Sequence, residues 1–574
     1  MNSADIVKEL QSDTEIAACA LERWAEVTGD KTFFYYGEEN RPISYKDFNA
    51  MANSIGNNLR SMGVEKGDRI SLFLKNPLVT TLAMFGIWKA GAVFCPINFN
   101  YRGRLLSYQL NDTKPRLLIL EIDMIPLIND VKDDIPPLRV FLHEPQKGDH
   151  DFNPEMAGIG LDKRFDRYPF GDLLKGEASN PGLDLKYYDT ANIIYTSGTT
   201  GPAKGVVQSH RWINQYTFNL RKFCTRDDVV YNDLPLYHVG GAFANVVRGA
   251  WSGCTVAVWD KFSPADFWRR IEVSGASAAI LLDVMIPWLM SAGETSRDRI
   301  NTLNKVHMQP LPQYHHQVAK RFGIDYVTCG YGQTEGGNGF VGIFDELDEG
   351  EGTPAELYKG YSREELRTVA DRYGYPMHSG KEDLPKGFMG KPSIFLEANI
   401  LNEHDEECAP GQFGQLAFRP KAPYSIFNEY FGKPEATLKT FRNFWFHTGD
   451  GCYKDEAGNF FFVDRMGGFI RTRGENISSY QIEDIINSHP GIDMSAAFPI
   501  PAEVGDEDDV VVYIVPKKGE ILKEDDLRNW IKAEMPKFMW PKYIRFIDDL
   551  PRTPTNKVEK YKLKEMILKE LGRS

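Results

Sequence analysis

The sequence has few of the features that mark secreted, zinc-binding or membrane-spanning proteins. Its seven cysteines form no Cys-x-x-Cys pair, and such a set fits a reducing compartment better than a disulfide framework. Its eleven histidines show no His-Glu-x-x-His spacing. The longest mainly apolar run, 278–290, contains Asp283 and Pro287 and is too short to span a bilayer. Because the first residues resemble no secretory signal, we expect a cytoplasmic protein without a membrane span.

Charge and length narrow the class of protein further. The net charge of -13 argues against a nucleic acid or an anionic membrane as the main partner. Apolar residues make up 42% and charged residues 26%, as in ordinary globular proteins. A chain of 574 residues exceeds the size of one hydrophobic core, so we expect two or more domains.

The first half of the chain alternates short apolar runs with helical patterns. Residues 69–74, 92–96 and 116–120 are typical of strands, and 79–90 of a helix. This alternation favours βαβ units with a mostly parallel sheet, so the predicted fold class is α/β, or α+β for the whole chain. The polar stretch from about 145 to 181 indicates a loop.

A later segment departs from this alternating pattern. Residues 344–387 begin with an acidic run and include a capping-box pattern from Ser362 to Glu365, which predicts a helix through Arg372. We interpret this segment as a surface insertion; a lid or an oligomer contact is the alternative.

The last part of the chain has the spacing of a small independent domain. Ser478 and Gln481 can cap a helix, and 509–515 and 543–547 are typical of strands. We therefore predict a domain at 1–464 and a second domain at 465–574.

The densest group of hydrogen-bond donors lies between Tyr195 and Gly205. Glycines, hydroxyls and Lys204 follow a short apolar run, which suits a loop that wraps a polyphosphate. It is not a Walker A loop, because Gly205 rather than Ser or Thr follows the lysine. The alternative is a flexible surface turn.

Three more motifs carry polar chemistry, although each alone is weak. Tyr331 to Glu335 offers an aromatic face, a hydroxyl and a carboxylate that could hold Mg²⁺. Asp450 follows Gly449 and could accept two hydrogen bonds from a ribose diol, or simply belong to a turn. Lys557 lies in a proline-rich loop, where a lysine usually faces solvent.

Taken together, these motifs resemble the acyl-adenylate-forming superfamily, which includes acyl-CoA synthetases, firefly luciferase and peptide-synthetase adenylation domains. The resemblance extends over roughly residues 15–570 and rests on 195–205, 331–335, 447–450, and 464–478 with Lys557 beyond. The segments 429–431 and 473–478 are most similar to acyl-CoA ligases, especially the carnitine and crotonobetaine group.

The resemblance implies an AMP-forming ligase that uses ATP, Mg²⁺ and coenzyme A. A carboxylate attacks the α-phosphate of ATP to form acyl-AMP, and coenzyme A then releases AMP. The implied fold is a large N-terminal domain of mixed and parallel sheets packed with helices, plus a small mobile C-terminal α+β domain. The partners would be a small or medium carboxylic acid, ATP and coenzyme A; a homo-oligomer stays open.

The resemblance also implies a role for each matching residue. The implied ATP site comprises Thr196, Ser197, Gly198, Thr199, Thr200 and Lys204 at the phosphates, Gly330, Tyr331, Gly332 and Gln333 with Tyr331 on adenine, Thr334 at the α-phosphate, Glu335 on Mg²⁺, and Asp450 and Arg465 at the ribose. Lys557 would bridge the carboxylate and the α-phosphate, Gly474 would line the pantetheine channel, and Gly467 would be the hinge. Relatives usually carry Asp or Lys at that hinge and Gly at the position of Asn556.

The acyl pocket is defined least well by the sequence. His238 would gate or line it, although a core histidine is the alternative, and Gly336, Gly337 and Asn338 would form other walls. Gln309 replaces a small residue of many relatives, so it would shorten the pocket and could bond a polar substrate. Asp283 could hold a cationic acid if it reached the pocket; a capped or surface position is the stronger expectation.

Two other functions remain open at this level. A stand-alone adenylating enzyme could load another acceptor, such as a carrier protein, or act as a luciferase-like oxygenase. A non-enzymatic protein with a decayed site is disfavoured, because Lys204, Glu335, Asp450, Arg465 and Lys557 are all present.

Overall fold

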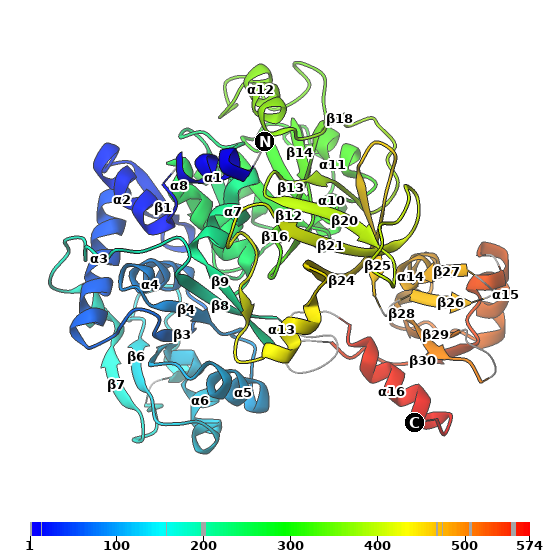
Figure 1. Ribbon diagram of the computed structural model, residues 1–574, viewed down its shortest axis with the longest axis horizontal. Helices are drawn as coiled ribbons and strands as arrows, with labels where there is room; N and C mark the ends of the chain where they lie inside the picture. The colour runs from blue at the N-terminus through cyan, green and yellow to red at the C-terminus, as the bar shows by residue number, and fades with distance from the viewer. Residues whose placement is uncertain are drawn as a thin grey trace.

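The computed structural model describes residues 3–12, 14–156, 158–196, 203–466, 469–472, 475–503, 508–535, 537–552 and 558–573. Within these ranges the chain forms two large sheets covered by helices, followed by a smaller group of strands and helices (Figure 1). The predicted α/β class is confirmed. The described helices are α1 (Ser3–Ser12), α2 (Ala17–Val27), α3 (Tyr45–Ser61), α4 (Pro77–Lys89), α5 (Gly103–Thr113), α6 (Ile125–Asp130), α7 (His210–Arg221), α8 (Arg248–Ser252), α9 (Phe267–Ser274), α10 (Ile286–Ser291), α11 (His315–Phe322), α12 (Arg363–Tyr373), α13 (Pro434–Thr440), α14 (Ser479–Asn487), α15 (Glu524–Glu534) and α16 (Lys560–Glu570). Shorter 3₁₀ turns are η1 (Gly37–Glu39), η2 (Ile122–Met124), η3 (Lys132–Asp134), η4 (Pro154–Met156), η5 (Phe170–Leu174) and η7 (Lys537–Met539), and η6 (Gly240–Val247) is a π-helix.

One sheet contains the strands predicted near the N-terminus. Its order is β22 (Glu429–Tyr430), β9 (Lys204–Ser209), β8 (Thr190–Thr196), β4 (Val93–Pro96), β3 (Arg69–Phe73), β5 (Leu117–Glu121), β6 (Arg139–His143) and β7 (Asp166–Pro169). The pairs from β8 to β7 are parallel, as the alternating pattern predicted, whereas β9 is antiparallel to β8 and to β22. The expectation of a loop over 145–181 is wrong for β7, a short strand with a polar sequence that extends the sheet edge.

Helix α4 corresponds to the helix predicted at 79–90 and has clear local signals at its start. Asn76 caps the helix, because its Oδ1 accepts hydrogen bonds from the amides of Leu78 and Val79 at 3.0 and 3.1 Å. Pro77 stands at the first helical position, where its missing N–H costs nothing. All residues of α4 are buried, which is expected of a helix that is apolar on every side.

The other large sheet joins distant parts of the chain. Its order is β2 (Arg41–Ser44), β1 (Thr32–Tyr36), β11 (Thr255–Val258), β10 (Val229–Asn232), β12 (Ala278–Leu282), β13 (Lys305–Gln309), β14 (Tyr326–Cys329), β17 (Phe340–Asp345), β19 (Phe388–Pro392), β25 (Phe460–Arg465), β24 (Trp445–Lys454), β21 (Gly414–Pro420) and β20 (Leu396–Leu401). Strands β18 (Met377–Ser379) and β23 (Phe441–Arg442) pair with β17 and β24. A parallel half, β10 to β14, therefore continues into an antiparallel half through β17.

The segment 344–387 lies only partly on the surface. Its predicted helix is confirmed as α12, and both hydrogen bonds of the capping box at Ser362 and Glu365 are present. Leu366, Ala370 and Tyr373 nevertheless pack into a core cluster, and the Tyr373 hydroxyl donates to Glu9 of α1 at 2.6 Å. The surface interpretation is therefore wrong for the apolar face of α12, which is difficult to detect from the sequence because most residues of the helix are polar.

The C-terminal elements have cores of their own and gather at one end of the molecule (Figure 1). They comprise β26 (Phe469–Thr472), β27 (Glu475–Ser478), β28 (Ile492–Pro501), β29 (Asp508–Pro516), β30 (Tyr543–Phe546) and the helices from α14 on. Their two buried clusters contain only residues from Ile470 onward. The helix and both strands predicted here are confirmed, whereas the side chains proposed to cap α14 lie outside the described ones. The domain boundary at 464/465 stays a prediction.

Candidate active site

Strands β8 and β9 bracket the glycine-rich loop. Thr196, the last residue of β8, pairs with Lys204, the first residue of β9, and both are partly exposed. The Tyr108 hydroxyl donates to the Ala203 carbonyl at 2.9 Å and fixes the returning end of the loop. Ser197, Gly198, Thr199 and Thr200 lie outside the described residues, so their phosphate role stays a prediction.

Lys204, Tyr430 and Glu335 come together although they lie far apart in the sequence. The Tyr430 hydroxyl donates to Oε1 of Glu335 at 2.9 Å, and the Lys204 ammonium lies 4.7 Å from the centre of the Tyr430 ring. The pairing of β22 with β9 places Tyr430 beside Val206, two residues beyond the lysine. The ammonium group of Lys204 and the carboxylate of Glu335 therefore both interact with the Tyr430 side chain, next to the end of the glycine-rich loop.

The backbone on either side of Glu335 is held by the surrounding fold. Its carbonyl accepts hydrogen bonds from the Trp212 indole at 3.3 Å and from the Phe427 amide at 2.8 Å. The neighbouring Thr334 carbonyl accepts from Gln208 Nε2 at 2.8 Å. These bonds fix the connection between β15 (Gly332–Gln333) and β16 (Gly337–Asn338), and both side chains of the pair are partly exposed.

The environment of Glu335 suits a carboxylate that binds a cation. Burial raises the pKa of its carboxyl above the ordinary value, while the hydrogen bond from Tyr430 and the charge of Lys204 act in the opposite direction. Mg²⁺ is commonly held by one or two carboxylates together with phosphate oxygens and water. A partly buried carboxylate beside the predicted phosphate loop therefore fits this metal.

Tyr331 and Asp450 contact each other directly through a hydrogen bond, which the resemblance did not predict. The Tyr331 hydroxyl donates to Oδ2 of Asp450, which also accepts from Gln333 Nε2 at 2.7 Å. Gln333 Nε2 also donates to the Thr448 carbonyl at 3.0 Å. The Tyr331 ring is only 7% exposed and packs against Phe340 and Phe418, so stacking on adenine stays a prediction.

Two buried acceptors beside Tyr331 have no protein partner among the described residues. These are Gln333 Oε1 and Asn338 Oδ1, and the latter lies 3.5 Å from where a Cβ on Gly330 would be. A buried acceptor without a donor is costly, so such groups usually meet a ligand or water. The amino group of a purine base is a donor of this kind, which makes the site compatible with a nucleotide.

The glycines expected in the acyl wall are required by packing. Gly337 has φ of +75°, and a Cβ there would lie 2.1 Å from Gln215 Oε1. A Cβ on Gly336 would lie 2.9 Å from the Phe418 ring. Gly336, Gly337 and Asn338 are buried, and the Asn338 carbonyl accepts from Gln215 Nε2 at 3.3 Å. Contact of these residues with an acyl group stays a prediction.

Gln309, His238 and Asp283 occupy different surroundings. The Gln309 amide nitrogen lies 3.8 Å from where a Cβ on Gly332 would be, so this side chain does reach the hairpin. His238 is exposed just before η6, with its ring 4.5 Å from that of Tyr237. Asp283 is exposed after β12 and accepts from the Val284 amide at 2.8 Å, which agrees with the expected surface position.

Several predicted residues cannot be placed. Lys557, Gly467, Gly474 and the side chain of Arg465 lie outside what the structure describes, although the Arg465 backbone pairs with Asp450. Their roles at the α-phosphate, hinge, pantetheine channel and ribose stay predictions.

Tyr430 was not assigned a role from the sequence. Its hydrogen bond to Glu335 depends on a two-residue strand, β22, paired across more than two hundred positions. The motif at 429–431 had served only for the resemblance, and no local pattern indicates that a tyrosine there faces a carboxylate.

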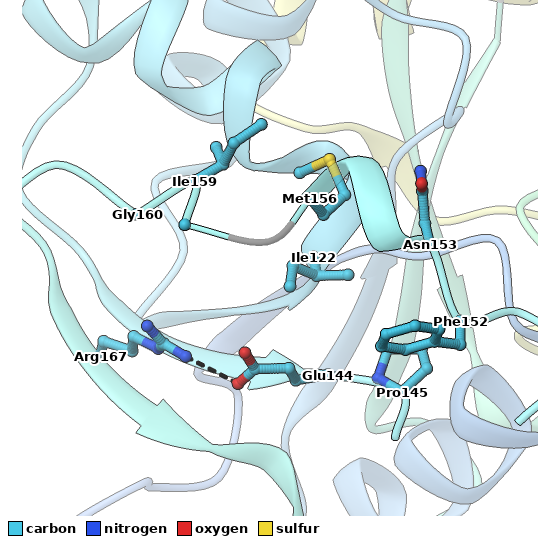
Figure 2. Close-up of a pocket in the computed structure, with 10 residues that line it drawn as sticks. Ile122, Glu144, Pro145, Phe152, Asn153, Met156, Ile159, Gly160 and Arg167 are labelled. Atoms are coloured by element: carbon cyan, nitrogen blue, oxygen red, sulfur yellow. Dashed lines mark hydrogen bonds and ion pairs between the residues drawn. The ribbon is translucent and has the colours of Figure 1, made fainter. Parts of the chain in front are cut away.

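A separate cavity of about 300 Å³ lies beside β6 and β7 (Figure 2). Ile122, Phe152 and Met156 line it, and Arg167 and Glu144 form an ion pair at 2.7 Å on one side. None of the predicted site residues lines it.

In the part of the chain that the structure describes, no helix has the length and apolar character needed to cross a membrane. All seven cysteines are free thiols, as expected.

The chain belongs to the family of AMP-binding enzymes. The model of the AMP-binding enzyme matches residues 21–431, and that of its C-terminal domain matches 481–557. This confirms the resemblance stated from the sequence and, with it, the class of AMP-forming acid–thiol ligases.

The similar proteins agree with this class. A crotonobetaine/carnitine–CoA ligase of Salmonella arizonae is 28% identical over 94% of this chain and 98% of its own. The ATP-bound MatB structure from Rhodopseudomonas palustris has a TM-score of 0.72 at 22% identity, covering 95% of this chain and 98% of its own. The AMP complex of the o-succinylbenzoate–CoA synthetase from Bacillus subtilis gives 0.72 at 21% identity, with the same coverages.

Proposed function

We propose that this enzyme joins a small or medium carboxylic acid to coenzyme A through an acyl-AMP intermediate. The observation that carries the proposal is the convergence of Lys204, Glu335, Tyr331 and Asp450 from separate parts of the sequence. The ammonium group of Lys204 suits phosphates, and the carboxylate of Glu335 suits the metal that accompanies them. Asp450 and the buried acceptors beside Tyr331 suit the hydrogen-bond donors of a nucleoside. The names of the similar ligases support coenzyme A as the acceptor.

The first step forms a mixed anhydride. A carboxylate oxygen of the acid attacks the α-phosphorus, and the bond to the bridging oxygen breaks as pyrophosphate leaves. Mg²⁺, when bound, supplies charge neutralisation at the phosphates. Lys204 would neutralise the leaving phosphates, and Glu335 would hold the metal in place. Lys557 would stabilise the charge that develops between the carboxylate and the α-phosphate.

The second step transfers the acyl group to a thiol. The sulfur of coenzyme A attacks the acyl carbon, the carbon–oxygen bond to phosphate breaks, and AMP leaves. The thiol proton passes to solvent or to the departing phosphate. Nothing in this step requires a covalent bond to the protein, so the contribution of the enzyme is positioning and charge.

The test supplies the protein with ATP, Mg²⁺, coenzyme A and a panel of carboxylic acids. We expect release of pyrophosphate and AMP that depends on the acid, and a thioester that depends on coenzyme A. Release of ADP would exclude adenylation. Acyl-AMP formation followed by transfer to a carrier protein, with no thioester of coenzyme A, would support the other acceptor instead.

A further inference from the structure

Three polar side chains form a chain of hydrogen bonds that ends at the hairpin of the active site. His307 and Gln309 lie two residues apart on β13, so their side chains share one face of the strand. His307 Nδ1 lies 3.0 Å from Thr328 Oγ1 on the neighbouring β14, and His307 Nε2 lies 3.1 Å from Gln309 Oε1. The register of the two strands places His307 directly beside Thr328.

The protonation of His307 gives this chain of hydrogen bonds a direction. Burial lowers the pKa of His307 to about 4, so the ring is neutral near pH 7 and carries a single N–H. Gln309 Oε1 can only accept, and therefore the hydrogen is on Nε2. Nδ1 then accepts from the Thr328 hydroxyl. The ring thereby fixes the Gln309 amide with its oxygen turned inward.

The opposite end of that amide faces the site. Gln309 Nε2 lies 3.8 Å from where a Cβ on Gly332 would be, directly after Tyr331. The side chain is partly exposed, and no hydrogen-bond partner of Nε2 is found among the described residues. A fixed donor pair therefore points toward Gly332, at the start of the hairpin that carries Thr334 and Glu335.

We propose that Gln309 determines substrate specificity, an inference that rests on the proposed function. Its amide donates to an oxygen acceptor on the acyl group, so the enzyme favours acids with a keto, hydroxyl or second carboxylate oxygen over alkyl acids of the same size. His307 and Thr328 are positioning residues for that amide. A site built to hydrogen-bond a substrate oxygen rejects an analogue without it, because the fixed donor is then left without a partner.

The experiment uses matched pairs of acids and the full-length enzyme. Each pair has one chain length and carries either an oxygen acceptor or a methyl branch on the third, fourth or fifth carbon. The readout is the ratio of kcat/KM for pyrophosphate release within each pair. We expect wild-type enzyme to favour the oxygenated acid by about 10-fold or more in at least one pair, as one neutral or charged hydrogen bond provides.

Two sets of variants separate the effect of the Gln309 amide from the effect of the residues that position it. Gln309→Leu should bring the ratio to within about 3-fold of unity, whereas Gln313→Leu at an exposed glutamine should retain it. Thr328→Val removes the hydroxyl that holds His307 Nδ1 and should lower the ratio part of the way, mainly through KM. Thr328→Ser keeps the hydroxyl and should restore the ratio.

The outcomes distinguish this inference from the proposed function. If no acid gives pyrophosphate, the proposed function fails. If acids react but the ratio is near unity in every pair, or is unchanged in Gln309→Leu, only the role of Gln309 is overturned. A change confined to the KM for ATP in Gln309→Leu would also overturn it, because the amide would then serve the nucleotide.

Discussion

At the scale of single residues, Glu335 is the side chain that we propose holds the metal. Its raised pKa means that the folded protein binds a proton there more tightly than an ordinary glutamate does. Protons and Mg²⁺ therefore compete for the same oxygens, and a loss of negative charge weakens the metal.

The first prediction concerns pH. As pH falls toward the raised pKa of Glu335, the concentration of Mg²⁺ needed for half-maximal adenylation should rise, and excess Mg²⁺ should move the acid limb to lower pH. The measurement is pyrophosphate release across pH at several Mg²⁺ concentrations. Glu335→Gln should be slower and should lose this coupling; an acid limb that ignores Mg²⁺ would contradict the assignment.

Tyr430 provides the second prediction at this scale. Tyr430→Phe keeps the ring beside Lys204 but removes the hydrogen bond to Glu335, so the Mg²⁺ requirement should rise by roughly 3- to 10-fold. Titration of Mg²⁺ at fixed pH measures it. Tyr373→Phe is the matched control, because its hydroxyl donates to Glu9 of α1 and not to a predicted site residue. Equal titrations for wild type and Tyr430→Phe would remove Tyr430 from the site.

At the scale of elements, the short hairpin β15–β16 and the helix α12 show opposite relations between sequence and structure. The hairpin has only two-residue strands, and it is positioned by side chains of α7 and β9 such as Trp212 and Gln208. Helix α12 is specified locally by its capping box, yet its place in the protein depends on three apolar side chains.

The third prediction tests α12 as part of the core. Leu366→Ala should lower the free energy of unfolding by about 2–4 kcal/mol, because the buried side chain leaves a cavity. Arg367→Ala on the exposed side of the same helix should change it by less than about 1 kcal/mol. Denaturant unfolding measures both. Adenylation rates at low temperature should stay similar, since no predicted site residue lies on α12; a folded but inactive Leu366→Ala would assign the helix to the active site.

At the scale of the whole molecule, the mobility of the C-terminal domain stays a prediction from the resemblance. In the structure, these elements have separate cores and contact the rest of the chain through polar groups such as the Lys386–Asp484 ion pair. Asp464 accepts from the Ser479 amide at 2.9 Å, which ties α14 to the end of β25. The Lys386–Asp484 pair is exposed and can be exchanged at low cost, whereas the hydrogen bond between Asp464 and Ser479 is buried and costs more to break.

The fourth prediction separates the two steps. Lys557→Ala should slow adenylation by on the order of 10²-fold or more, as expected from the loss of a charge used in the transition state. Transfer from preformed acyl-AMP to coenzyme A should suffer much less. Rates of pyrophosphate release and of thioester formation from synthetic acyl-AMP measure the two steps; equal losses would contradict the role of Lys557.

Local signals along the chain were sufficient for the elements that the sequence predicted. The capping box marks the start of α12, because its side chains satisfy backbone groups next to them. The cap of α4 at Asn76 and Pro77 is equally local, but the predicted helix began two residues later. The apolar runs of β3, β4 and β5 indicated buried strands, and their alternation with a helical pattern indicated a parallel sheet. The motifs around Lys204, Tyr331, Glu335 and Asp450 also identified the family before any contact was known.

Only the tertiary structure decided which side chains meet. The hydrogen bonds from Tyr430 to Glu335 and from Tyr331 to Asp450 join segments that are distant in the sequence. His307 and Gln309 share one strand, but Thr328 on the neighbouring strand holds the other side of the His307 ring. The apolar face of α12 and the strand β7 were hidden for the same reason, since burial and sheet edges are set by neighbours. A sequence specifies its own turns and caps, whereas the partner of a side chain depends on how the whole chain folds.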